Sequence, residues 1–335
     1  MKSILLTGGG GYIGSHVLRL LASKNNYDIT VIDNLERGFN CPIDIIKKES
    51  LSYINFIKMD LRYENEYQKL NNKKFDAILH FAAYLNINES TKKPLEYFEN
   101  NITGSINLIK YIKKTKSKNF LFSSTCSLYS RKAKLPFTEK SEISPENPYS
   151  ESKYMMEKII HWCSKSYKFN YIILRYFNPC GSSLDNKIGY SLIPSPQLIP
   201  ALIRGILGLQ DFEITCGKVN TPDKTTIRDY INILDLADTH EISLKALLEG
   251  HKSNIYNIGI GKGLSILEII KLAYEVTSKK IVIKFGNKRE GELPVTICDH
   301  SKFISEFKWK PKYTIKEAIS TLYEWFKANP KGYKY

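Results

Sequence analysis

The segment TGGGGYIG, residues 7–14, decides how the rest of the chain is interpreted. It follows a short apolar run and precedes residues 12–23, whose apolar side chains recur at helical spacing. Gly8, Gly11 and Gly14 have the spacing GxxGxxG, a close relative of GxGxxG. In such a turn one glycine permits the bend, one lets the backbone approach a pyrophosphate, and one lets helix and strand lie close together. The segment therefore predicts a dinucleotide-binding turn, with phosphates at the positive end of the helix.

A carboxylate at the end of the next apolar run supports this interpretation. Asp33 follows residues 29–32 and lies 19 residues after Gly14. At that position it can accept hydrogen bonds from the ribose hydroxyls of an adenosine, and it would repel a 2′-phosphate. Arg37 could instead hold such a phosphate, but Asp33 occupies the discriminating position. The segment favours NAD over NADP, and a structural glycine turn with a chance aspartate is the weaker alternative.

Apolar runs and helical patterns alternate through the first half of the chain. Further strands are expected at 54–59, 77–81, 120–122 and 171–174, and long helices at 95–114 and 148–167. This alternation predicts an α/β protein with a Rossmann-like, doubly wound parallel sheet that carries helices on both faces.

The alternation breaks down after about residue 176, where prolines and glycines become frequent. The chain has 335 residues, more than the roughly 250–300 at which one hydrophobic core usually stops growing. We therefore expect an NAD-binding Rossmann domain over residues 1–176 and a smaller C-terminal α/β substrate lobe over residues 177–335. Strand and helix patterns near residues 230–261 are expected to return to the first domain.

Composition and charge exclude several classes of protein. Apolar residues make up 42% and charged residues 25%, and no run predicts a membrane span or a secretory signal. The six cysteines lie far apart without a CxxC pair, so we expect no metal site, no disulfide framework and a cytoplasmic location. The net charge of +15 comes from scattered lysines without a basic block. It predicts a solvated lysine-rich surface rather than a nucleic-acid partner.

A second motif, Tyr149-x-x-x-Lys153, lies on the expected helix 148–167. The spacing puts both side chains on one helix face. A tyrosine acts as a base near pH 7 only if its pKa falls from about 10, which requires about 4 kcal/mol of differential stabilisation. A neighbouring ammonium and a positively charged nicotinamide can supply that stabilisation. Thr125 follows the expected strand 120–122, where parallel sheets bind ligands. Taken alone, the motif could also be a solvated Tyr–Lys pair.

The glycine turn, the strand-end Ser-Ser-Thr run and the Tyr-x-x-x-Lys motif together resemble the extended short-chain dehydrogenase/reductase family. Longer stretches narrow the resemblance to the UDP-glucose 4-epimerases of that family, essentially from end to end. The stretches that carry it are residues 7–16, 33–35, 80–83, 94–97, 100–101, 174–179, 228–230, 256–257, 289–294 and 329–333.

This resemblance implies an isomerase of carbohydrate and galactose metabolism, which performs NAD-dependent 4-epimerisation of a UDP-hexose through a transient 4-keto sugar. Tyr149 would take the proton of the sugar 4-hydroxyl, and Thr125 would relay or orient it. Lys153 would hold the nicotinamide ribose and keep the pKa of Tyr149 low. NAD would be regenerated in each cycle and would stay tightly bound. The helices 95–114 and 148–167 resemble those that form a four-helix dimer contact in relatives, which predicts a homodimer.

The resemblance also implies a set of ligand-binding residues. Those expected around the cofactor are Gly8, Gly11, Tyr12, Ile13, Gly14, Asp33, Asn34, Leu35, Asp60, Leu61, Phe81, Ala82, Ala83, Asn100, Thr125, Tyr149, Lys153 and Phe177. Those expected around the UDP-sugar are Asn178, Gln197, Leu198, Arg228, Tyr230, Arg289, Glu292 and Thr296. The two arginines suit a diphosphate because a guanidinium binds phosphate oxygens bidentately, although each could also be an ordinary surface ion pair.

Several positions depart from the family pattern. Leu85, Gln197, Cys216 and Asn232 replace residues that are usual there, which leaves details of nucleotide affinity open. Thr296 stands where relatives that accept only UDP-glucose and UDP-galactose carry a bulky tyrosine. We therefore expect UDP-GlcNAc and UDP-GalNAc to be accepted as well.

Other activities of the same fold stay open. The chain could be an epimerase of UDP-glucuronate or of a UDP-pentose, or a non-catalytic NAD-binding regulator, although regulators usually lose the tyrosine or the lysine. Sugar-nucleotide dehydratases and decarboxylases are disfavoured. They carry a carboxylate at the strand end, where this chain has Thr125-Cys126-Ser127.

Overall fold

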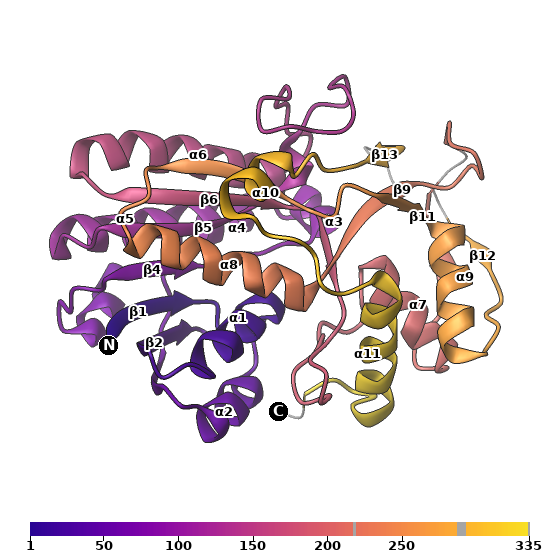
Figure 1. The fold of residues 1–335 in the computed structure, drawn as a ribbon, viewed down its shortest axis with the longest axis horizontal. Helices are drawn as coiled ribbons and strands as arrows, with labels where there is room; N and C mark the ends of the chain where they lie inside the picture. Colours follow the sequence, from indigo (N-terminus) through magenta and orange to yellow (C-terminus); the bar gives the residue numbers. More distant parts are fainter. Residues whose placement is uncertain (217–218, 287–292, 334–335) are drawn as a thin grey trace.

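The computed structural model describes residues 1–216, 219–286 and 293–333, and a parallel sheet forms its centre (Figure 1). Within those residues the sheet has seven strands in the order β10-β6-β5-β4-β1-β2-β3, and every neighbouring pair is parallel. The strands are β1 (Lys2–Thr7), β2 (Tyr27–Asp33), β3 (Tyr53–Lys58), β4 (Ala77–His80), β5 (Asn119–Thr125), β6 (Asn170–Tyr176) and β10 (Asn254–Ile258). The strand order reverses between β1 and β4, at the kind of switch point where such sheets bind ligands. The expected Rossmann-like architecture is confirmed.

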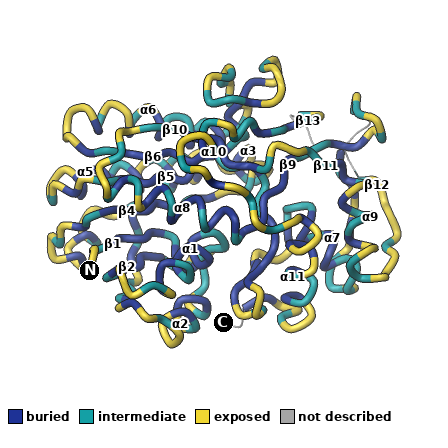
Figure 2. Tube along the Cα trace, in the orientation of Figure 1, coloured by how far each residue is buried: buried dark blue, intermediate teal, exposed yellow. Residues whose placement is uncertain are grey.

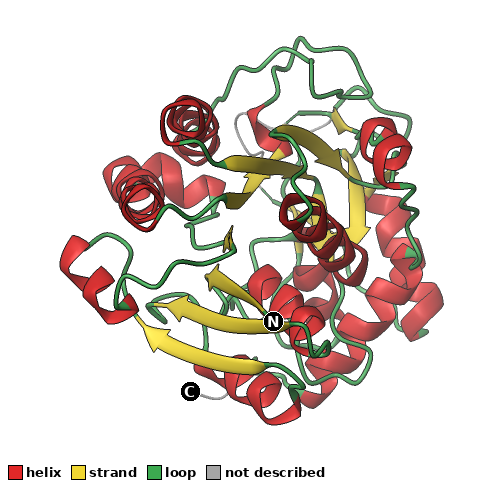
Figure 3. Cartoon of the chain, turned by 60° about the vertical axis from the view of Figure 1, so that its left-hand side comes forward, coloured by secondary structure: helices red, strands yellow, loops and turns green. Residues whose placement is uncertain are grey.

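Helices cover both faces of this sheet, because its strands point side chains alternately into two apolar cores. In β1, Ile4 and Leu6 belong to one core and Leu5 belongs to the other. The first core is covered by α1 (Tyr12–Ala22), α2 (Asn40–Glu49) and α8 (Ile233–Leu248), and the second by α5 (Gly104–Thr115) and α6 (Pro148–Tyr167). Figure 2 shows buried residues along the strands and α8, and Figure 3 shows helices on either side of the strands.

The helix expected over residues 95–114 is interrupted. It consists of α4 (Pro94–Phe98), a π-helical turn (Glu99–Thr103) and α5. The π turn buries Asn101, whose amide group bonds with the backbone of Tyr84 in both directions. Regular apolar spacing does not reveal such a turn, because its cause is a buried polar side chain whose partners lie elsewhere. The helices α2 and α3 (Ile87–Lys92) were not predicted, whereas α6 begins and ends where the sequence placed it.

A smaller lobe is built around β9 (Ile227–Asn232). This strand pairs with β7 (Asn178–Cys180) and β13 (Val295–Thr296) in parallel and with β11 (Gly263–Ser265) in antiparallel orientation. The other elements of this lobe are α7 (Leu198–Ile206), β8 (Glu213–Ile214), α9 (Ile266–Thr277), β12 (Lys284–Phe285) and α11 (Ile315–Ala328). Outside it lie α10 (Ser301–Phe307), which packs on the first core, and the 3₁₀ turns Glu64–Leu70 and Cys126–Leu128, which follow β3 and β5. A third apolar core, with contributions from α7, α9 and α11, lies under this lobe.

The chain returns to the large sheet after β9. The helix α8 follows directly and contacts α1, and β10 then pairs with β6 at the sheet edge. A domain boundary near residue 176 stays a prediction, since α8 contacts elements of both lobes. None of the described helices is both long and apolar enough to cross a membrane.

Candidate active site

The glycine turn between β1 and α1 has no room for side chains at two positions. Gly8 has φ +76°, and a Cβ there would lie 2.6 Å from the backbone nitrogen of Ala82. A Cβ on Gly14 would lie 2.1 Å from the carbonyl oxygen of Gly8. Gly11 caps α1, and within the described chain no side chain accepts a hydrogen bond at this cap and no acidic residue lies in the first turn. The turn therefore leaves backbone donors and a positive helix end for an anion, which fits a dinucleotide pyrophosphate.

Asp33 ends β2 beside this turn and is fixed by two backbone donors. Its Oδ2 accepts a hydrogen bond from Gly10 N at 2.9 Å, and its Oδ1 accepts one from Leu35 N at 2.8 Å. Burial raises the pKa of the carboxyl group, and these two hydrogen bonds oppose the rise. The carboxylate is thus held next to the phosphate-binding turn, where a ribose hydroxyl can donate to it.

Arg37, the alternative 2′-phosphate ligand, is already engaged. Its guanidinium forms a bidentate ion pair with Glu89, with nitrogen–oxygen distances of 2.7 and 3.0 Å. It also stacks 3.6 Å from the ring centroid of Tyr84. The structure therefore strengthens the case against a 2′-phosphate. Sequence reasoning missed Glu89 and Tyr84, because they lie about fifty residues from Arg37 and form no local pattern with it.

The loop after β3 places Asp60 against a second arginine. Arg62 Nη2 lies 2.6 Å from Asp60 Oδ2, and Asn34 Nδ2 donates to the same oxygen at 3.0 Å. Burial alone would raise the pKa of Asp60, but the hydrogen bonds from Arg62 and Asn34 hold it below its usual value. Leu61 is buried next to them. The expected cofactor residues Asn34 and Asp60 thus lie together, in the loops that follow neighbouring strands.

The segment after β4 lies across the switch point from Thr7. Phe81 N donates to the carbonyl of Thr7 at 3.1 Å, and Ala82 N lies 3.4 Å from its hydroxyl. The expected residues Phe81, Ala82 and Ala83 therefore adjoin the glycine turn, in accord with the close approach of Ala82 to Gly8.

Two expected cofactor residues connect distant segments. The hydroxyl of Tyr12, at the start of α1, donates to the carbonyl of Gly181 at 2.7 Å, just after β7. Ile13 contacts the first apolar core. Phe177 is buried, and its backbone N donates to the carbonyl of Ile258 at 3.0 Å.

Asn100 lies in the π turn, on the α4–α6 side of the sheet. Its Nδ2 donates to Asn101 Oδ1 at 3.0 Å. Because Asn101 also donates to Ser152 Oγ on α6 at 3.0 Å, the π turn is bonded to the helix that carries the Tyr-x-x-x-Lys motif.

The Tyr-x-x-x-Lys helix meets the carboxyl end of β5. Tyr149 lies in the first turn of α6, which Asn147 caps through its side chain. Burial and the nearby phenol of Tyr176 raise the pKa of Tyr149, while a hydrogen bond with Thr125 lowers it. Thr125 is buried at the last position of β5. The structure thus brings the expected base and the expected hydroxyl into contact.

Lys153 lies one helical turn further and is buried. Its Nζ donates to the carbonyl of Ser123 at 2.9 Å and lies 4.9 Å from the ring centroid of Phe122. Burial lowers the pKa of Lys153 to about 7, and the carboxylate of Glu157 opposes this shift. With a pKa near 7, the Lys153 ammonium can lose its proton close to neutral pH. The expected effect of Lys153 on the pKa of Tyr149 therefore depends on the groups that keep Lys153 protonated.

The residues expected around the UDP-sugar are organised by β9. Asn178 Nδ2 donates to the carbonyl of Asp229 at 2.8 Å, and its strand pairs it with Tyr230. Towards the start of β9, Thr296 pairs with Arg228. Arg228 Nη1 donates to its neighbouring carbonyl, Ile227 O, at 2.9 Å. Three strands distant in sequence thus bring Asn178, Tyr230, Arg228 and Thr296 to one small sheet.

The other expected substrate residues are less closely tied to this sheet. Gln197 and Leu198 lie at the start of α7, where Gln197 is the N-cap position and makes no side-chain cap. Arg289 and Glu292 lie outside the described residues.

The departures from the family pattern have distinct structural settings. Asn232 caps α8, since its Oδ1 accepts a hydrogen bond from Leu234 N at 3.0 Å, so its identity suits the start of that helix. Leu85 is exposed, and Cys216 is buried in the third core. Among the described residues, no group of His, Cys, Asp and Glu side chains could hold a metal ion.

A parallel sheet with a glycine turn at its switch point, and a Tyr-x-x-x-Lys pair beyond it whose lysine is buried, defines a dinucleotide-dependent enzyme of the short-chain type. Residues 4–259 match the NAD dependent epimerase/dehydratase family. The chain is 38% identical to the UDP-glucose 4-epimerase of Lactobacillus helveticus, over 99% of both chains. The chain belongs to this family, and its resemblance to UDP-glucose 4-epimerases is confirmed.

Solved structures agree with this assignment. The UDP-glucose 4-epimerase from Bifidobacterium longum, in complex with NAD+ and UDP, is similar with a TM-score of 0.93 and 29% identity, over 99% of this chain and 100% of that one. The UDP-Glc/GlcNAc 4-epimerase from Campylobacter jejuni is similar with a TM-score of 0.83 and 34% identity, over 98% of this chain and 100% of that one.

Proposed function

We propose that this chain is an isomerase that interconverts UDP-glucose and UDP-galactose by NAD-dependent 4-epimerisation, through a transient 4-keto sugar. The observation that carries the proposal is the position of Tyr149 in the first turn of α6, one helical turn before the buried Lys153 and near enough to Thr125, at the end of β5, for that hydroxyl to lower its pKa. Sheets of this topology bind their ligands there.

NAD, held tightly, supplies a reversible hydride acceptor for C4 of the sugar. The glycine turn fits its pyrophosphate, since Gly8 and Gly14 have no space for a side chain and the N-terminus of α1 is open to an anion. Asp33 would accept from the adenosine ribose, and Asn34 and Asp60 lie on the same side of the sheet. The other proposed cofactor residues are Gly11, Tyr12, Ile13, Leu35, Leu61, Phe81, Ala82, Ala83, Asn100, Thr125, Tyr149, Lys153 and Phe177.

Tyr149 is the proposed acid–base residue. As a phenolate it takes the proton of the sugar 4-hydroxyl, and as a phenol it returns that proton when the sugar is reduced again. Thr125 bonds to the phenol and orients the proton transfer. A protonated Lys153 stabilises the phenolate, which must gain about 4 kcal/mol to act near pH 7.

The UDP end would be held by the small sheet around β9. Arg228 is proposed to bind phosphate oxygens, because a guanidinium offers two parallel donors. Asn178, Tyr230, Gln197 and Leu198 are proposed to surround the nucleotide. Arg289 and Glu292 are proposed as further ligands from the resemblance alone.

Thr296 supports acceptance of the N-acetylated sugars UDP-GlcNAc and UDP-GalNAc. Its side chain is small and buried, and within the described chain its Oγ1 has no hydrogen-bond partner. An unpaired buried hydroxyl is costly, so it is suited to a polar group on a ligand. The Campylobacter jejuni relative is named as a UDP-Glc/GlcNAc 4-epimerase.

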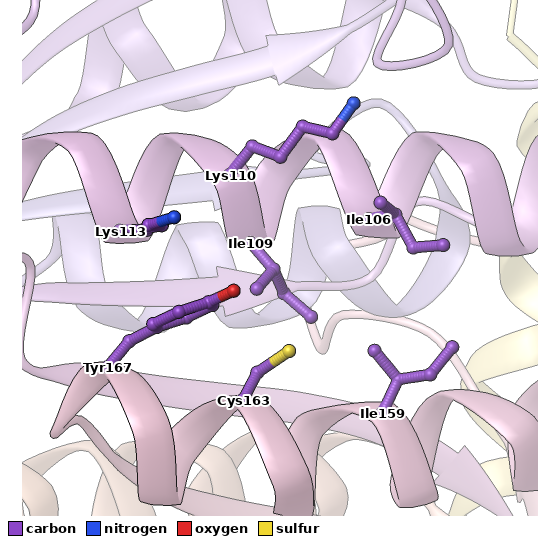
Figure 4. Close-up of a pocket in the computed structure, with 7 residues that line it drawn as sticks. All are labelled: Ile106, Ile109, Lys110, Lys113, Ile159, Cys163 and Tyr167. Atoms are coloured by element: carbon purple, nitrogen blue, oxygen red, sulfur yellow. The ribbon is translucent and has the colours of Figure 1, made fainter.

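We also propose a homodimer that uses the exposed sides of α5 and α6. A groove of about 290 Å³ lies between these helices. Figure 4 shows its lining: Ile106, Ile109, Lys110 and Lys113 from α5, and Ile159, Cys163 and Tyr167 from α6. Trp162 on α6 is 68% exposed, an unusual position for a large aromatic side chain unless a partner covers it. A second copy related by a twofold axis would cover both helices with the same surface. A monomer in light scattering would contradict this proposal.

The decisive experiment is an incubation of the purified protein with UDP-glucose, UDP-galactose, UDP-GlcNAc and UDP-GalNAc, without added NAD, followed by measurement of product ratios. We expect turnover of all four sugars, and NAD in the supernatant after denaturation. Turnover of the plain sugars alone would contradict the assignment of Thr296. In parallel incubations with UDP-glucuronate and a UDP-pentose, conversion of either one, with none of the four hexoses turned over, would overturn the hexose assignment.

A further inference from the structure

A buried ion pair includes a residue on the same face of α6 as Tyr149 and Lys153. Glu157 follows Lys153 by four residues, as Lys153 follows Tyr149, so all three side chains lie on one face of the helix. Glu157 pairs with Arg175 of β6, and both side chains are only 3% exposed. A charge in such a place is unusual, because burial of an ionised carboxylate is costly unless several donors compensate it.

The last residues of β5 contact this helix face one by one. Ser123 accepts the hydrogen bond from Lys153 Nζ at 2.9 Å, and Ser124 Oγ donates to Glu157 Oε1 at 2.5 Å. Thr125, the next residue, bonds with Tyr149. Three consecutive residues at the end of β5 therefore contact Tyr149, Lys153 and Glu157, and not the Tyr-x-x-x-Lys pair alone.

Arg175 holds the carboxylate of Glu157 in a fixed position. Its Nε and Nη2 donate to the two carboxylate oxygens, with the shortest distance 2.6 Å. Its Nη1 donates to Tyr129 Oη at 3.1 Å, and that hydroxyl donates to Asn257 Oδ1 at 2.6 Å. Since Ser124 and Arg175 are register partners on β5 and β6, both donors to Glu157 come from the rigid sheet.

The titratable groups around Lys153 leave Glu157 as its source of negative charge. His80 on β4 is neutral at pH 7, because burial lowers its pKa to about 3. Burial raises the pKa values of Tyr97 on α4, Cys126 after β5 and Tyr176 on β6 to about 12. Burial also raises the pKa of Tyr149 on α6, so all four groups are neutral at pH 7. Among these described groups, Glu157 is the anion that favours the protonated form of Lys153.

We propose that Glu157, fixed by Arg175 and Ser124, is a positioning residue that keeps Lys153 protonated beside Tyr149. The inference rests on the proposed function, since it assigns a task to Lys153 in the same reaction. Glu157 itself does not reach the sugar: its oxygens are occupied by Ser124 and Arg175.

The test is Glu157→Gln in the holoprotein, measured as a pH profile of kcat. Loss of the anion lowers the pKa of Lys153, so the ammonium is lost at a lower pH. We expect the alkaline limb of the profile to move down by about one pH unit, with about a tenfold lower kcat at pH 8 and an unchanged KM. Glu157→Asp, which keeps the charge, should restore most of the profile. Glu151→Gln is the matched control, because it makes the same change on α6 two residues from Lys153, off the shared face.

A second readout does not depend on turnover. The phenolate absorbance of Tyr149 is obtained as the difference between each protein and its Tyr149→Phe counterpart during a pH titration. In Glu157→Gln this phenolate should appear at a higher pH. If no UDP-sugar is turned over, the proposed function fails, and this titration still tests the role of Glu157.

Removal of one partner of a buried ion pair can unfold a protein, whereas apolar replacement of both partners is often tolerated. The double variant Glu157→Met/Arg175→Met therefore serves as the second form of the test, and it should show a shift in the same direction. Folded variants whose pH profile and phenolate titration both match the native protein would show that the ion pair is purely structural, and would overturn the proposal.

Discussion

On the cofactor side, several of the proposed ligand residues lie in loops that follow neighbouring strands of one sheet, where hydrogen bonds fix their side chains. Gly10 of the glycine turn donates a hydrogen bond to Asp33, Arg62 donates one to Asp60, and Arg37 forms an ion pair with Glu89. On the UDP side, Arg228 lies on β9, and Asn178 and Thr296 lie on β7 and β13, the two strands that pair with β9 in parallel. The first side is built from loops at one edge of the large sheet, whereas the second depends on the register of β9 with two other strands. We therefore expect a substitution to change mainly the side on which it lies, except at Tyr149, where both sides meet, and at Tyr12, which bonds from one lobe to the other.

The largest effect is expected for Tyr149→Phe, at the point shared by the two sides. The phenol oxygen is lost while the ring stays, so kcat should fall by about 10³-fold or more, in the range of general acid–base catalysis. Bound NAD and the melting temperature should stay within error of the native values, because neither side loses a packing contact. Near-normal turnover in this variant would remove Tyr149 from the mechanism.

The next largest effect is expected for Gly8→Ala, which tests the cofactor side alone. The new Cβ combines a positive φ with a 2.6 Å contact to the backbone of Ala82, so we expect a loss of about 3 kcal/mol in the free energy of unfolding. The protein should also lose its NAD. Gly208→Ala is the matched control, because Gly208 has φ +70° but no atom within 4 Å of its Cβ position. It should cost only about 1 kcal/mol. If chemical denaturation gave the same loss of unfolding free energy for both variants, the close approach of Gly8 to the backbone of Ala82 would have no effect on stability.

Thr296→Tyr tests the UDP side alone. The larger side chain on β13 fills space next to Arg228, the register partner of residue 296 on β9. It should lower kcat/KM for UDP-GlcNAc by about 30-fold relative to UDP-glucose. Thr296→Ser keeps the hydroxyl and stays small, and it should leave that ratio close to native. The cofactor content of both variants should be unchanged. A parallel loss for all sugars in Thr296→Tyr would show general damage to the lobe rather than selectivity.

The smallest effect is expected for Glu89→Gln, which asks whether Arg37 is kept from a 2′-phosphate by its partner. Without the carboxylate, the guanidinium is available to another anion, and the affinity for NADP relative to NAD should rise by about threefold, as befits a partly exposed ion pair. Asp33 still opposes the phosphate, so NAD should remain preferred. Equilibrium binding of the two dinucleotides measures the ratio, with Glu66→Gln as the charge-matched control. An unchanged ratio would mean that Glu89 has no part in the selection.

The same contrast explains what could be predicted from the sequence. The glycine turn, Asp33 and the helix of Tyr149 and Lys153 were predicted because each depends on spacing within a short segment. The pairing of Arg37 with Glu89 was not predictable in this way, because it joins residues that follow different strands. The π turn at Asn101 was missed for the same reason.

Glu157 is an intermediate case. Its spacing from Lys153 is visible in the sequence, but charged residues four apart on a helix are common. Only its burial against Arg175 distinguishes it, and burial of a polar group is decided by the whole fold. On the UDP side, the resemblance named the residues, but the register of β9 that places Thr296 opposite Arg228 has no local signal.

The hydrogen bond from Tyr12 to Gly181 has a thermodynamic consequence. It joins Tyr12, the first residue of α1, whose N-terminus is the proposed site of the dinucleotide phosphates, to the chain just beyond β7. A ligand that orders either end of this bond reduces the entropy that the other ligand must still remove. We therefore expect the two binding equilibria to be linked, and because linkage is reciprocal, NAD should change the affinity for the UDP-sugar by the same factor by which the UDP-sugar changes the affinity for NAD.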